Sequence, residues 1–472
     1  MSIVGNRVKA EWIKQSHLLT DPETTTIAAR SVACDNEGNI YTVGFITGSA
    51  KVGHLTLTPR NPSPFITKQN SCGAFIYTKT GIVASGLARC ETITVDNEGF
   101  LYVAGTFQGD LKFSDLKTLH NPFPTLSFFT AKFNSATGEP VWATASTIID
   151  SGSSSPAAIT HDDKYLYLTG GFTGTIAIGS KTLFSPNGTN VFTTKLTKCG
   201  KFKWSKQSIQ SSPPPSFSFG NGIFVNCHQT YVIGVYNKDI SFDTITLLSN
   251  GINEVFIIII DSLTGEVKKG TQTKSSNGTG AVGRALVVDS RNNIYATGFF
   301  HGETIFGNVT FTSPSNVSSI SFISKLKDLS WIKTVIPDTQ NDPGNVNRAI
   351  GIVLDEDDSN LRICVTGSFI GNIKFGNIDP LISAPNTSFY LTRLSKQLKF
   401  DTAFQSTNLN QAASQNFIFQ QPISLMKHNV LATIGIFTGA LRTEQLLIYS
   451  NTPLNTNILG QNFWISKLRI SD

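Results

Sequence analysis

One pattern recurs seven times along the chain and limits what the chain can fold into. It is a strand-like segment of the form Tyr-x-x-Gly-x-Phe-x-Gly, complete or with substitutions, at residues 40–48, 101–109, 166–174, 230–238, 294–302, 363–371 and 431–439. The first glycines of successive copies are 61, 65, 64, 64, 69 and 68 residues apart. So steady a period predicts one repeat architecture rather than several unrelated domains.

Each copy has the same internal order, which predicts four strands. An apolar strand ends in a turn such as Asp35–Gly38 or Asp96–Gly99, where Asp bonds local amides and Gly accepts a positive φ. The glycine-containing strand follows, and its glycine allows a neighbouring backbone or aromatic ring to approach closely. After a polar loop come a third strand and a last strand, which carries Trp142, Trp204 or Trp331 in several copies. A meander of four strands is one blade of a β-propeller.

A basic residue recurs on the expected third strand. Its regular placement predicts a structural role, in which the aliphatic stem covers the next blade and the charge reaches water. The residues are Lys79, Lys132, Lys195, Lys325, Arg393 and Lys467, and Ile259 takes this place in the fourth copy.

The two ends of the chain predict how the blades form a ring. Residues 8–17 match a last strand such as 201–209, and residues 462–470 match a third strand with no last strand after it. Pairing of these two segments would complete the final blade and remove an open sheet edge. The sequence therefore predicts an all-β fold. It is a single domain over residues 1–472, a seven-bladed β-propeller of four-stranded antiparallel blades, closed by the N-terminal strand pairing with the C-terminal strand.

These motifs resemble the SBBP family of β-propeller repeats, in which an Asp-x-x-Gly-Asn turn precedes a Tyr-x-x-Gly-x-Phe-x-Gly strand. The resemblance covers nearly the whole chain. It is most specific around Gly44, Gly105, Gly170 and Gly298, and weakest in the seventh copy, where Ala432 replaces the tyrosine. Similar repeats occur mostly in large surface or structural proteins, so the resemblance implies a propeller and brings no catalytic motif.

Composition and charge exclude several classes of function. The net charge of +6 is small for 472 residues and is spread along the chain, unlike the clustered basic face of a nucleic-acid-binding protein. The longest apolar run, Val255 to Ile260, is too short to cross a bilayer. Residues 1–12 lack the apolar core of a signal peptide. We therefore expect a cytoplasmic or virion-associated protein, no membrane insertion, and six cysteines that are buried and reduced.

No motif of an enzyme or of a cofactor site is present. The sequence contains no P-loop, no Gly-x-Ser-x-Gly elbow, no His-Glu-x-x-His and no Cys-x-x-Cys. We expect no catalysis, no cofactor and no bound metal. An alternative is Ca²⁺ at the acidic turn Asp355–Asp358, because clustered carboxylates are the ligands that it prefers. A solvated turn is the interpretation that we favour.

Four arginines form the first candidate binding site. Arg30 and Arg284 each lie five residues before a turn aspartate, and Arg89 and Arg348 lie seven residues before theirs. These offsets share parity, so the side chains are predicted to point to equivalent faces of the innermost strands, near the mouth of the axial channel. The hypothesis is a basic collar that binds an anion or an acidic partner segment. Pairing with neighbouring loops is the competing interpretation, which we favour.

The second candidate site is the face formed by the long loops that connect blades and join second to third strands. These loops are rich in Pro, Asn and Ser and poor in carboxylates, which suits a protein or glycan partner better than acid–base catalysis. The candidate binding residues on this face are Arg60, Phe123, Phe217 and Asn345.

Three functions of different classes follow from this sequence. The favoured one is a non-catalytic scaffold that binds another protein through the loop face or the channel mouth. A carbohydrate-binding propeller would stack loop aromatic rings on sugars. A propeller hydrolase or lyase would need carboxylates that converge from different blades, and the available donors are Asp21, Glu23, Glu91, Asp150 and Asp338.

Overall fold

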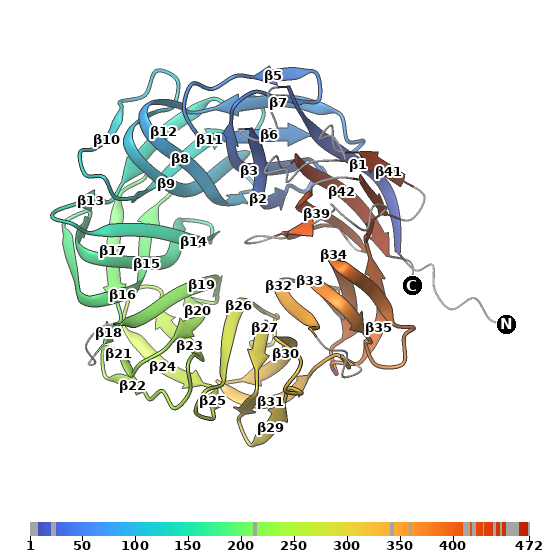
Figure 1. Ribbon diagram of the computed structural model, residues 1–472. Helices are drawn as coiled ribbons and strands as arrows, with labels where there is room; N and C mark the ends of the chain where they lie inside the picture. The colour runs from blue at the N-terminus through green and yellow to red at the C-terminus, as the bar shows by residue number, and fades with distance from the viewer. Residues whose placement is uncertain are drawn as a thin grey trace.

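The chain forms antiparallel β-sheets arranged around a central opening like the blades of a propeller (Figure 1). The computed structural model describes residues 8–19, 25–210, 215–339, 344–357, 360–408, 416–417, 422–427, 429–437, 440–443, 446–449 and 462–470. These residues form strands and loops, and they include no helix that is long and apolar enough to span a membrane. The prediction of an all-β propeller is confirmed.

Most sheets repeat one four-stranded order, in which consecutive strands pair from the inside outward. The first is β2 (Thr26–Cys34), β3 (Ile40–Thr47), β6 (Ser63–Gln69) and β7 (Phe75–Thr80). The same order occurs in β8 (Ile82–Val95), β9 (Phe100–Lys112), β11 (Ser127–Asn134) and β12 (Pro140–Ala145); in β14 (Ser153–His161), β15 (Tyr165–Ile178), β16 (Lys181–Thr197) and β17 (Phe202–Gln207); in β19 (Ser216–Asn226), β20 (Gln229–Tyr236), β23 (Glu254–Asp261) and β24 (Val267–Gln272); in β26 (Gly280–Val288), β27 (Asn293–His301), β30 (Ile320–Lys327) and β31 (Ser330–Val335); and in β32 (Val346–Glu356), β33 (Leu361–Ile373), β34 (Leu381–Ser395) and β35 (Phe400–Gln405).

Short additional strands lie in the loops between the main strands. Between second and third strands lie β4 (Ala50–Val52), β5 (Leu55–Leu57), β10 (Leu119–Asn121), β21 (Ile240–Phe242), β22 (Ile245–Leu247), β28 (Glu303–Phe306), β29 (Val309–Thr312), β40 (Ala440–Thr443) and β41 (Leu446–Tyr449). Between successive sheets lie β13 (Thr147–Ile148), β18 (Ile209–Gln210), β25 (Lys274–Ser275) and β36 (Thr407–Asn408).

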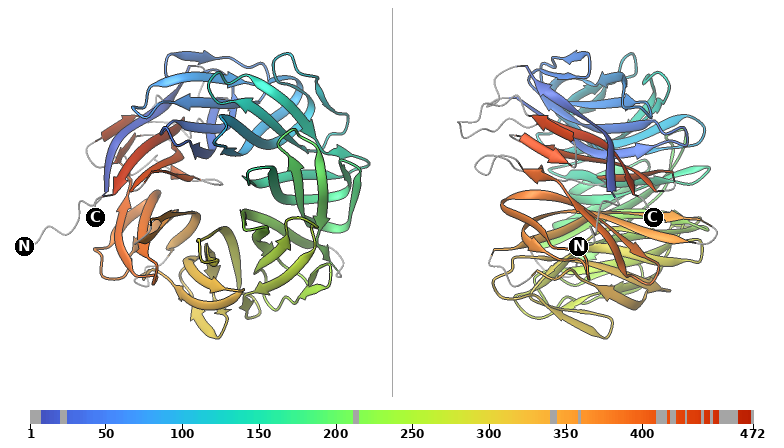
Figure 2. Two further views of the ribbon diagram at one scale, coloured as in Figure 1. Left: turned by 180° about the vertical axis from the view of Figure 1, so that it is seen from behind. Right: turned by 90° about the vertical axis from the view of Figure 1, so that its right-hand side faces the viewer.

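The last sheet joins strands from both ends of the described chain. It contains β37 (Asn416–Phe417) and β38 (Ile423–Lys427), both paired with β39 (Val430–Phe437), then β42 (Asn462–Ile470) and β1 (Val8–Leu18). β1 is antiparallel to β42, with a register from Val8 opposite Ile470 to Gln15 opposite Trp464. Figure 2 shows the blue N-terminal strand beside the red C-terminal strands.

The hydrophobic core lies between neighbouring sheets rather than at one centre. Between the last sheet and the first, for example, Ile27 and Ile46 pack with Ile434 and Ile465. The ring of Phe65 stacks on that of Phe463 with centroids 5.4 Å apart. Each blade is therefore stabilised by the apolar face of the next one.

A β-bulge on the innermost strand explains the recurring glycine of the second strand. In six sheets the pairing register slips by one residue directly opposite that glycine. The bulge turns a carbonyl toward the glycine, and a Cβ there would overlap this oxygen, as Gly44 with Ala28 and Gly298 with Val282. The predicted close approach is confirmed. The bulge residues are Arg30, Glu91, Ala157, Asn221, Arg284 and Ile350.

The tyrosine of the repeat bonds the turn before it. The Tyr41 hydroxyl donates to Asp35 Oδ2 at 2.8 Å, and the Tyr102 hydroxyl donates to Asp96 Oδ2 at 3.0 Å. The other oxygen of each aspartate accepts backbone N–H groups of the turn. One carboxylate thus closes the turn and satisfies the tyrosine hydroxyl, which explains why an aspartate precedes the tyrosine in these copies.

The basic residue of the third strand lies opposite that tyrosine and has a structural role. Lys132 Nζ is 3.6 Å from the centroid of the Phe100 ring. Lys195 Nζ is 3.7 Å from the Tyr165 ring and donates to Ser262 O of the next sheet at 2.7 Å. Lys195 is buried, so its ammonium group contacts a carbonyl and an aromatic ring. The expectation that this charge reaches water is wrong.

The assignment of Lys79 to this series is wrong. Lys79 lies on the outer strand β7, where its Nζ is 2.6 Å from Glu139 Oε1 of the neighbouring sheet. The residue opposite the first-sheet tyrosine is Lys68, on β6, with Nζ 5.4 Å from the Tyr41 ring centroid. The outer segment FIYTKT has the same alternation as a third strand, which is why the pattern misplaced it.

Three tryptophans of outermost strands connect their sheet to the next one. In three places the indole N–H donates to a carbonyl in the following sheet's outer turn, and the ring covers a glycine of that turn. The contacts are Trp142 to Lys198 O (3.0 Å), Trp204 to Ser262 O (3.1 Å) and Trp12 to Ser71 O (3.1 Å). The last contact joins the final sheet to the first with the geometry of the other two.

Candidate binding site at the axial channel

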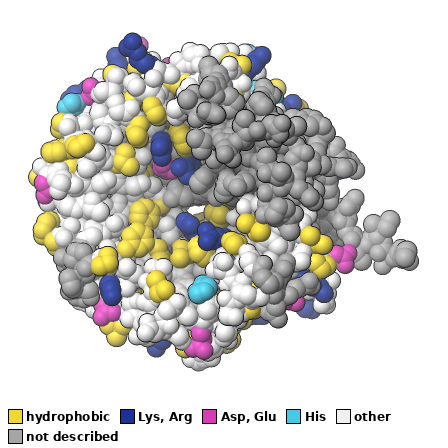
Figure 3. All heavy atoms as spheres, in the orientation of Figure 1, with side chains coloured by type: hydrophobic (Ala, Val, Ile, Leu, Met, Phe, Trp, Pro, Cys, Tyr) yellow, Lys and Arg dark blue, Asp and Glu magenta, His cyan; other side chains and the backbone are white. Residues whose placement is uncertain are grey.

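A cavity of about 290 Å³ lies along the axis, surrounded by the innermost strands. One aliphatic residue at the same position of each innermost strand lines it, two residues after the bulge where a bulge is described. These residues are Val32, Ile93, Ile159, Ile223, Leu286, Ile352 and Ile423. In Figure 3 the face toward the viewer is hollowed at this centre.

The bulge residues Asn221, Arg284 and Ile350 line the cavity toward the start of their strands. Asn221 and Arg284 are polar, and Thr94, Thr160 and Ser424 add polar side chains toward the other end. Asn221 Nδ2 donates to Gly283 O of the neighbouring strand at 2.7 Å, which holds this part of the wall in place. In these three sheets the bulge thus places its side chain at the cavity wall.

Two of the predicted arginines meet on one phenylalanine. The guanidinium carbons of Arg30 and Arg89 lie 5.4 and 4.7 Å from the Phe45 ring centroid. Arg30 Nε is also 3.6 Å from Glu91 Oε2, the bulge residue of the next sheet. Burial raises the pKa of Glu91, against the charges of Arg30 and Arg89. Arg30 thus pairs with a residue of the neighbouring strand β8, whereas the favoured interpretation placed the partners of the arginines in neighbouring loops.

The other two arginines meet on a second phenylalanine. The guanidinium carbons of Arg284 and Arg348 lie 5.6 and 4.9 Å from the Phe299 ring centroid. Arg348 Nε donates to Ser319 Oγ at 3.4 Å. Burial and the nearby charge of Arg348 both lower the pKa of Arg284. Within the described part of the chain, neither of these two arginines forms an ion pair.

The four arginines therefore form two pairs and not one continuous collar. Figure 3 shows two groups of basic side chains beside the central opening, one of them with an acidic side chain next to it. Sequence reasoning identified the four arginines, but it did not identify Phe45 and Phe299, the rings that the two arginines of each pair both contact. A signal was present: among the residues that follow the seven repeat glycines, only these two are phenylalanine. Binding by the arginines stays a prediction.

The loop-face candidates have different surroundings. Arg60 is exposed. Phe217 is 37% exposed and stacks on Phe219, with centroids 6.2 Å apart. Phe123 is half-buried against a core cluster between two sheets. Arg60 and Phe217 thus remain accessible to a ligand, whereas Phe123 mainly packs.

Asn345 is a correction to the predicted loop face. Its side chain is fully buried, and Nδ2 donates to Thr339 O at 2.7 Å and to Asn372 O at 2.9 Å. Oδ1 accepts from Asn372 N at 3.1 Å. The amide ties two segments together and is not exposed to a partner, because a polar loop residue can satisfy its own backbone instead of a ligand.

Among the carboxylates named for a hydrolase or lyase, the three that the structure describes, Glu91, Asp150 and Asp338, do not line the axial cavity. Asp150 accepts from Thr175 N and Oγ1 at 3.1 and 2.6 Å, and Asp338 joins Lys374 through its backbone. Asp21 and Glu23 lie outside the described residues.

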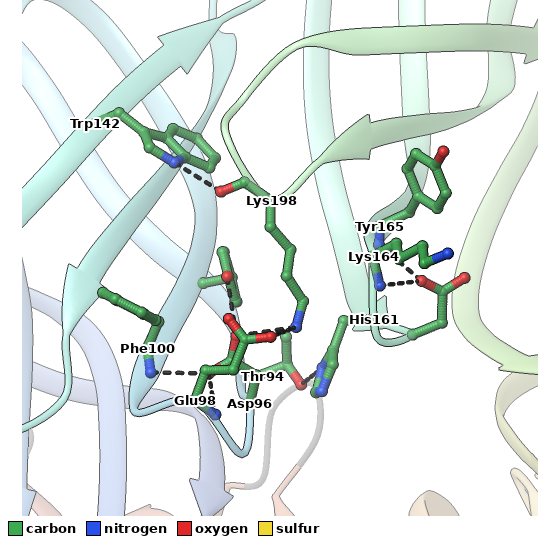
Figure 4. A network of polar contacts seen from close by, with 11 residues as sticks. Thr94, Asp96, Glu98, Phe100, Trp142, His161, Lys164, Tyr165 and Lys198 are labelled. Atoms are coloured by element: carbon green, nitrogen blue, oxygen red, sulfur yellow. Dashed lines mark hydrogen bonds and ion pairs between the residues drawn. The ribbon is translucent and has the colours of Figure 1, made fainter.

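The turns at the other end of the strands carry a polar network (Figure 4). Lys198 Nζ lies 3.1 Å from Asp96 Oδ2, and the Thr94 hydroxyl is 2.9 Å from His161 Nδ1. Burial and then the charge of Lys198 lower the pKa of His161. The network joins neighbouring sheets and is satisfied internally, so it serves structure.

The acidic turn considered for Ca²⁺ is described only in part. Asp355 Oδ2 accepts from Asn429 N of the next sheet at 2.8 Å, so one of its oxygens serves as a structural acceptor. Asp358 lies outside the described residues. Among the residues that the structure describes, no three His, Cys, Asp or Glu side chains are grouped to hold a metal ion.

Comparison with known proteins found solved structures of low similarity only. No protein-family model matches the sequence, and no curated protein matches it. The propeller of Dos1 is 7% identical with a TM-score of 0.41, over 98% of this chain and 97% of that one. The WD40 domain of SCAP from fission yeast is 8% identical with a TM-score of 0.34, over 98% of each chain. An ulvan lyase is 11% identical with a TM-score of 0.42, over 87% and 91%. At these values the comparisons assign the chain neither an activity nor a partner.

Proposed function

We propose that the protein is a non-catalytic binding scaffold that receives an acidic segment of another protein at the mouth of its axial channel. In this proposal the scaffold is a seven-bladed propeller of SBBP-like repeats, and the pairing of β1 with β42 closes its ring. The register of that pairing and the contact of Trp12 with Ser71 support closure, because the same contact joins sheets elsewhere in the ring.

The observation that carries the proposal is the axial cavity with arginines at its rim. A concave, mostly apolar site with a few convergent polar groups is the usual form of a binding site. Among the described side chains that line the cavity, Arg284 is the one titratable group. Acid–base catalysis needs positioned groups that exchange protons near neutral pH, which a guanidinium does not do. The cavity therefore favours binding over hydrolysis or elimination.

The experiment that tests this function is affinity purification of the tagged protein with a charge-reversed channel mouth. The double variant Arg284→Glu/Arg348→Glu is compared with wild type and with Lys268→Glu/Lys269→Glu. The control pair lies exposed on the outer strand β24 and reverses the same charge far from the axis. We expect one partner to co-purify with wild type and with the control, and to be lost with the arginine variant. A partner retained by the arginine variant would contradict the proposal.

A further inference from the structure

Two places at the channel mouth have the same construction, and they differ in one residue. Each has an arginine at the bulge of one innermost strand, a phenylalanine after the repeat glycine, and an arginine two residues before the next strand's bulge. The arginine-to-ring distances agree, at 5.4 and 4.7 Å in the first place and 5.6 and 4.9 Å in the second. These two triads are Arg30, Phe45 and Arg89 in the first place, and Arg284, Phe299 and Arg348 in the second.

The residue that differs is the bulge of the second strand in each place. On β8 the bulge falls at Glu91, between Cys90 and Thr92. On β32 it falls at Ile350, between Ala349 and Gly351. The first place therefore contains its own carboxylate, 3.6 Å from Arg30. In the second place an aliphatic side chain stands where that carboxylate would be.

The second triad is left with two like charges and no counter-charge in the described part of the chain. Arg284 Nε is buried and has no hydrogen-bond partner among the described residues. A desolvated guanidinium with a like charge beside it is unfavourable unless an anion compensates it. Arg284 and Ile350 both line the axial cavity, so the space next to them is open to a ligand.

We propose that Arg284 and Arg348 form a carboxylate-binding site, which takes from a partner the group that Glu91 supplies to the first triad. This rests on the proposed function and names the chemistry that its partner presents. Guanidinium groups bind carboxylates through paired, charge-assisted hydrogen bonds. Because aliphatic residues line the cavity beside the site, an apolar residue next to the acidic one would fit there.

Propionate is a suitable probe, because it is the glutamate side chain as a free molecule. It is titrated into the purified full chain while thermal unfolding is followed, with propionamide as the uncharged match and sodium chloride at equal ionic strength. We expect the melting temperature to rise and saturate with propionate only. An equal response to inorganic phosphate would overturn the assignment to carboxylates, as would a rise that follows ionic strength.

Variants at one position connect the response to this site. Ile350→Glu recreates the first triad, so we expect it to melt at a higher temperature than wild type and to lose the response to propionate. Ile350→Gln has the same shape without the charge and should keep the response. Arg284→Gln/Arg348→Gln should lose it without gaining stability. A response that survives in both Ile350→Glu and the double arginine variant would refute the site.

The outcome separates this inference from the proposed function. If propionate fails while charge reversal at Arg284 and Arg348 still removes the partner, only the carboxylate assignment falls. If propionate binds as expected while the partner remains bound to the charge-reversed protein, the site stands and the scaffold proposal falls.

Discussion

Trp12, on strand β1 of the last sheet, contacts the first sheet, and its replacement by alanine removes this contact. The indole hydrogen bond to Ser71 O at 3.1 Å is lost, and the ring leaves the glycine that it covers, Gly73. Truncation of a fully buried tryptophan costs about 3–5 kcal/mol. Trp12 is half-buried, so we expect about 2–3 kcal/mol, of which about 1 kcal/mol comes from the hydrogen bond.

Trp204→Ala is the matched control, because its indole makes the same contact between two interior sheets, at 3.1 Å. An unfolding entropy of roughly 2.1 cal/mol/K per residue over 472 residues gives about 1 kcal/mol per kelvin. Both variants should therefore melt about 2–3 °C below wild type by scanning calorimetry. If Trp204→Ala falls by this amount and Trp12→Ala does not fall, β1 does not join the first sheet to the last in the way described, and the closed ring is refuted.

Three further predictions concern the repeat and its turns. Gly105→Ala places a Cβ against Arg89 O and should lower the free energy of unfolding, measured in urea, by about 3 kcal/mol or more. The control Gly278→Ala has nothing within 4 Å of the new Cβ and should lower it by about 1–2 kcal/mol, for the positive φ alone. Equal losses would contradict the bulge argument. Burial acts to raise the pKa of Asp96, but hydrogen bonds, including one from Lys198, lower it below the usual 3.8, so the stability that they provide is present above that pH and lost as pH falls through the lowered value. Lys198→Met should therefore lower the free energy of unfolding by about 2–3 kcal/mol at pH 7 and by less below pH 3.8. Urea unfolding at a series of pH values measures this difference. A loss of stability that does not depend on pH would contradict the prediction. The expectation that all six cysteines are buried is wrong, because Cys72, Cys199 and Cys227 are exposed. Burial raises the pKa of Cys364 to about 12, so a thiol reagent should modify the native protein quickly only at the exposed thiols. Fast labelling of Cys364, measured by mass spectrometry, would show that its sheet opens.

The strands were predictable because each copy repeats residues that a blade requires. A glycine lies opposite the bulge in six described sheets, and a tyrosine that bonds the turn aspartate and an outer tryptophan recur in several of them. The sequence pattern therefore follows the geometry of the blade. Exposure of single loop residues was not predictable. Asn345 illustrates this, since the same amide that suits a ligand bonds Thr339 and Asn372 instead.

The candidate site was predictable in its members and not in its grouping. Counting residues back from the turn aspartate located the arginines. The prediction of where their side chains point assumed that side chains alternate along an uninterrupted strand. The bulge falls on Arg30 and on Arg284, while Arg89 and Arg348 precede the bulges of their own strands. The extra residue of the bulge changes which side chains meet. The position of such a bulge cannot be recognised from the alternation of hydrophobic residues.

The pairing of Val8 with Ile470 has a consequence for biosynthesis. β1 precedes every other described strand in the chain and its partner β42 follows all of them, so β1 keeps an unpaired edge until the strands between them have been synthesised. Among the described strands no pairing joins residues farther apart in the sequence, and non-local contacts form slowly. A circularly permuted gene, with residue 470 linked to residue 8 and new ends opened in a loop between sheets, would remove the wait and should reach the folded state sooner.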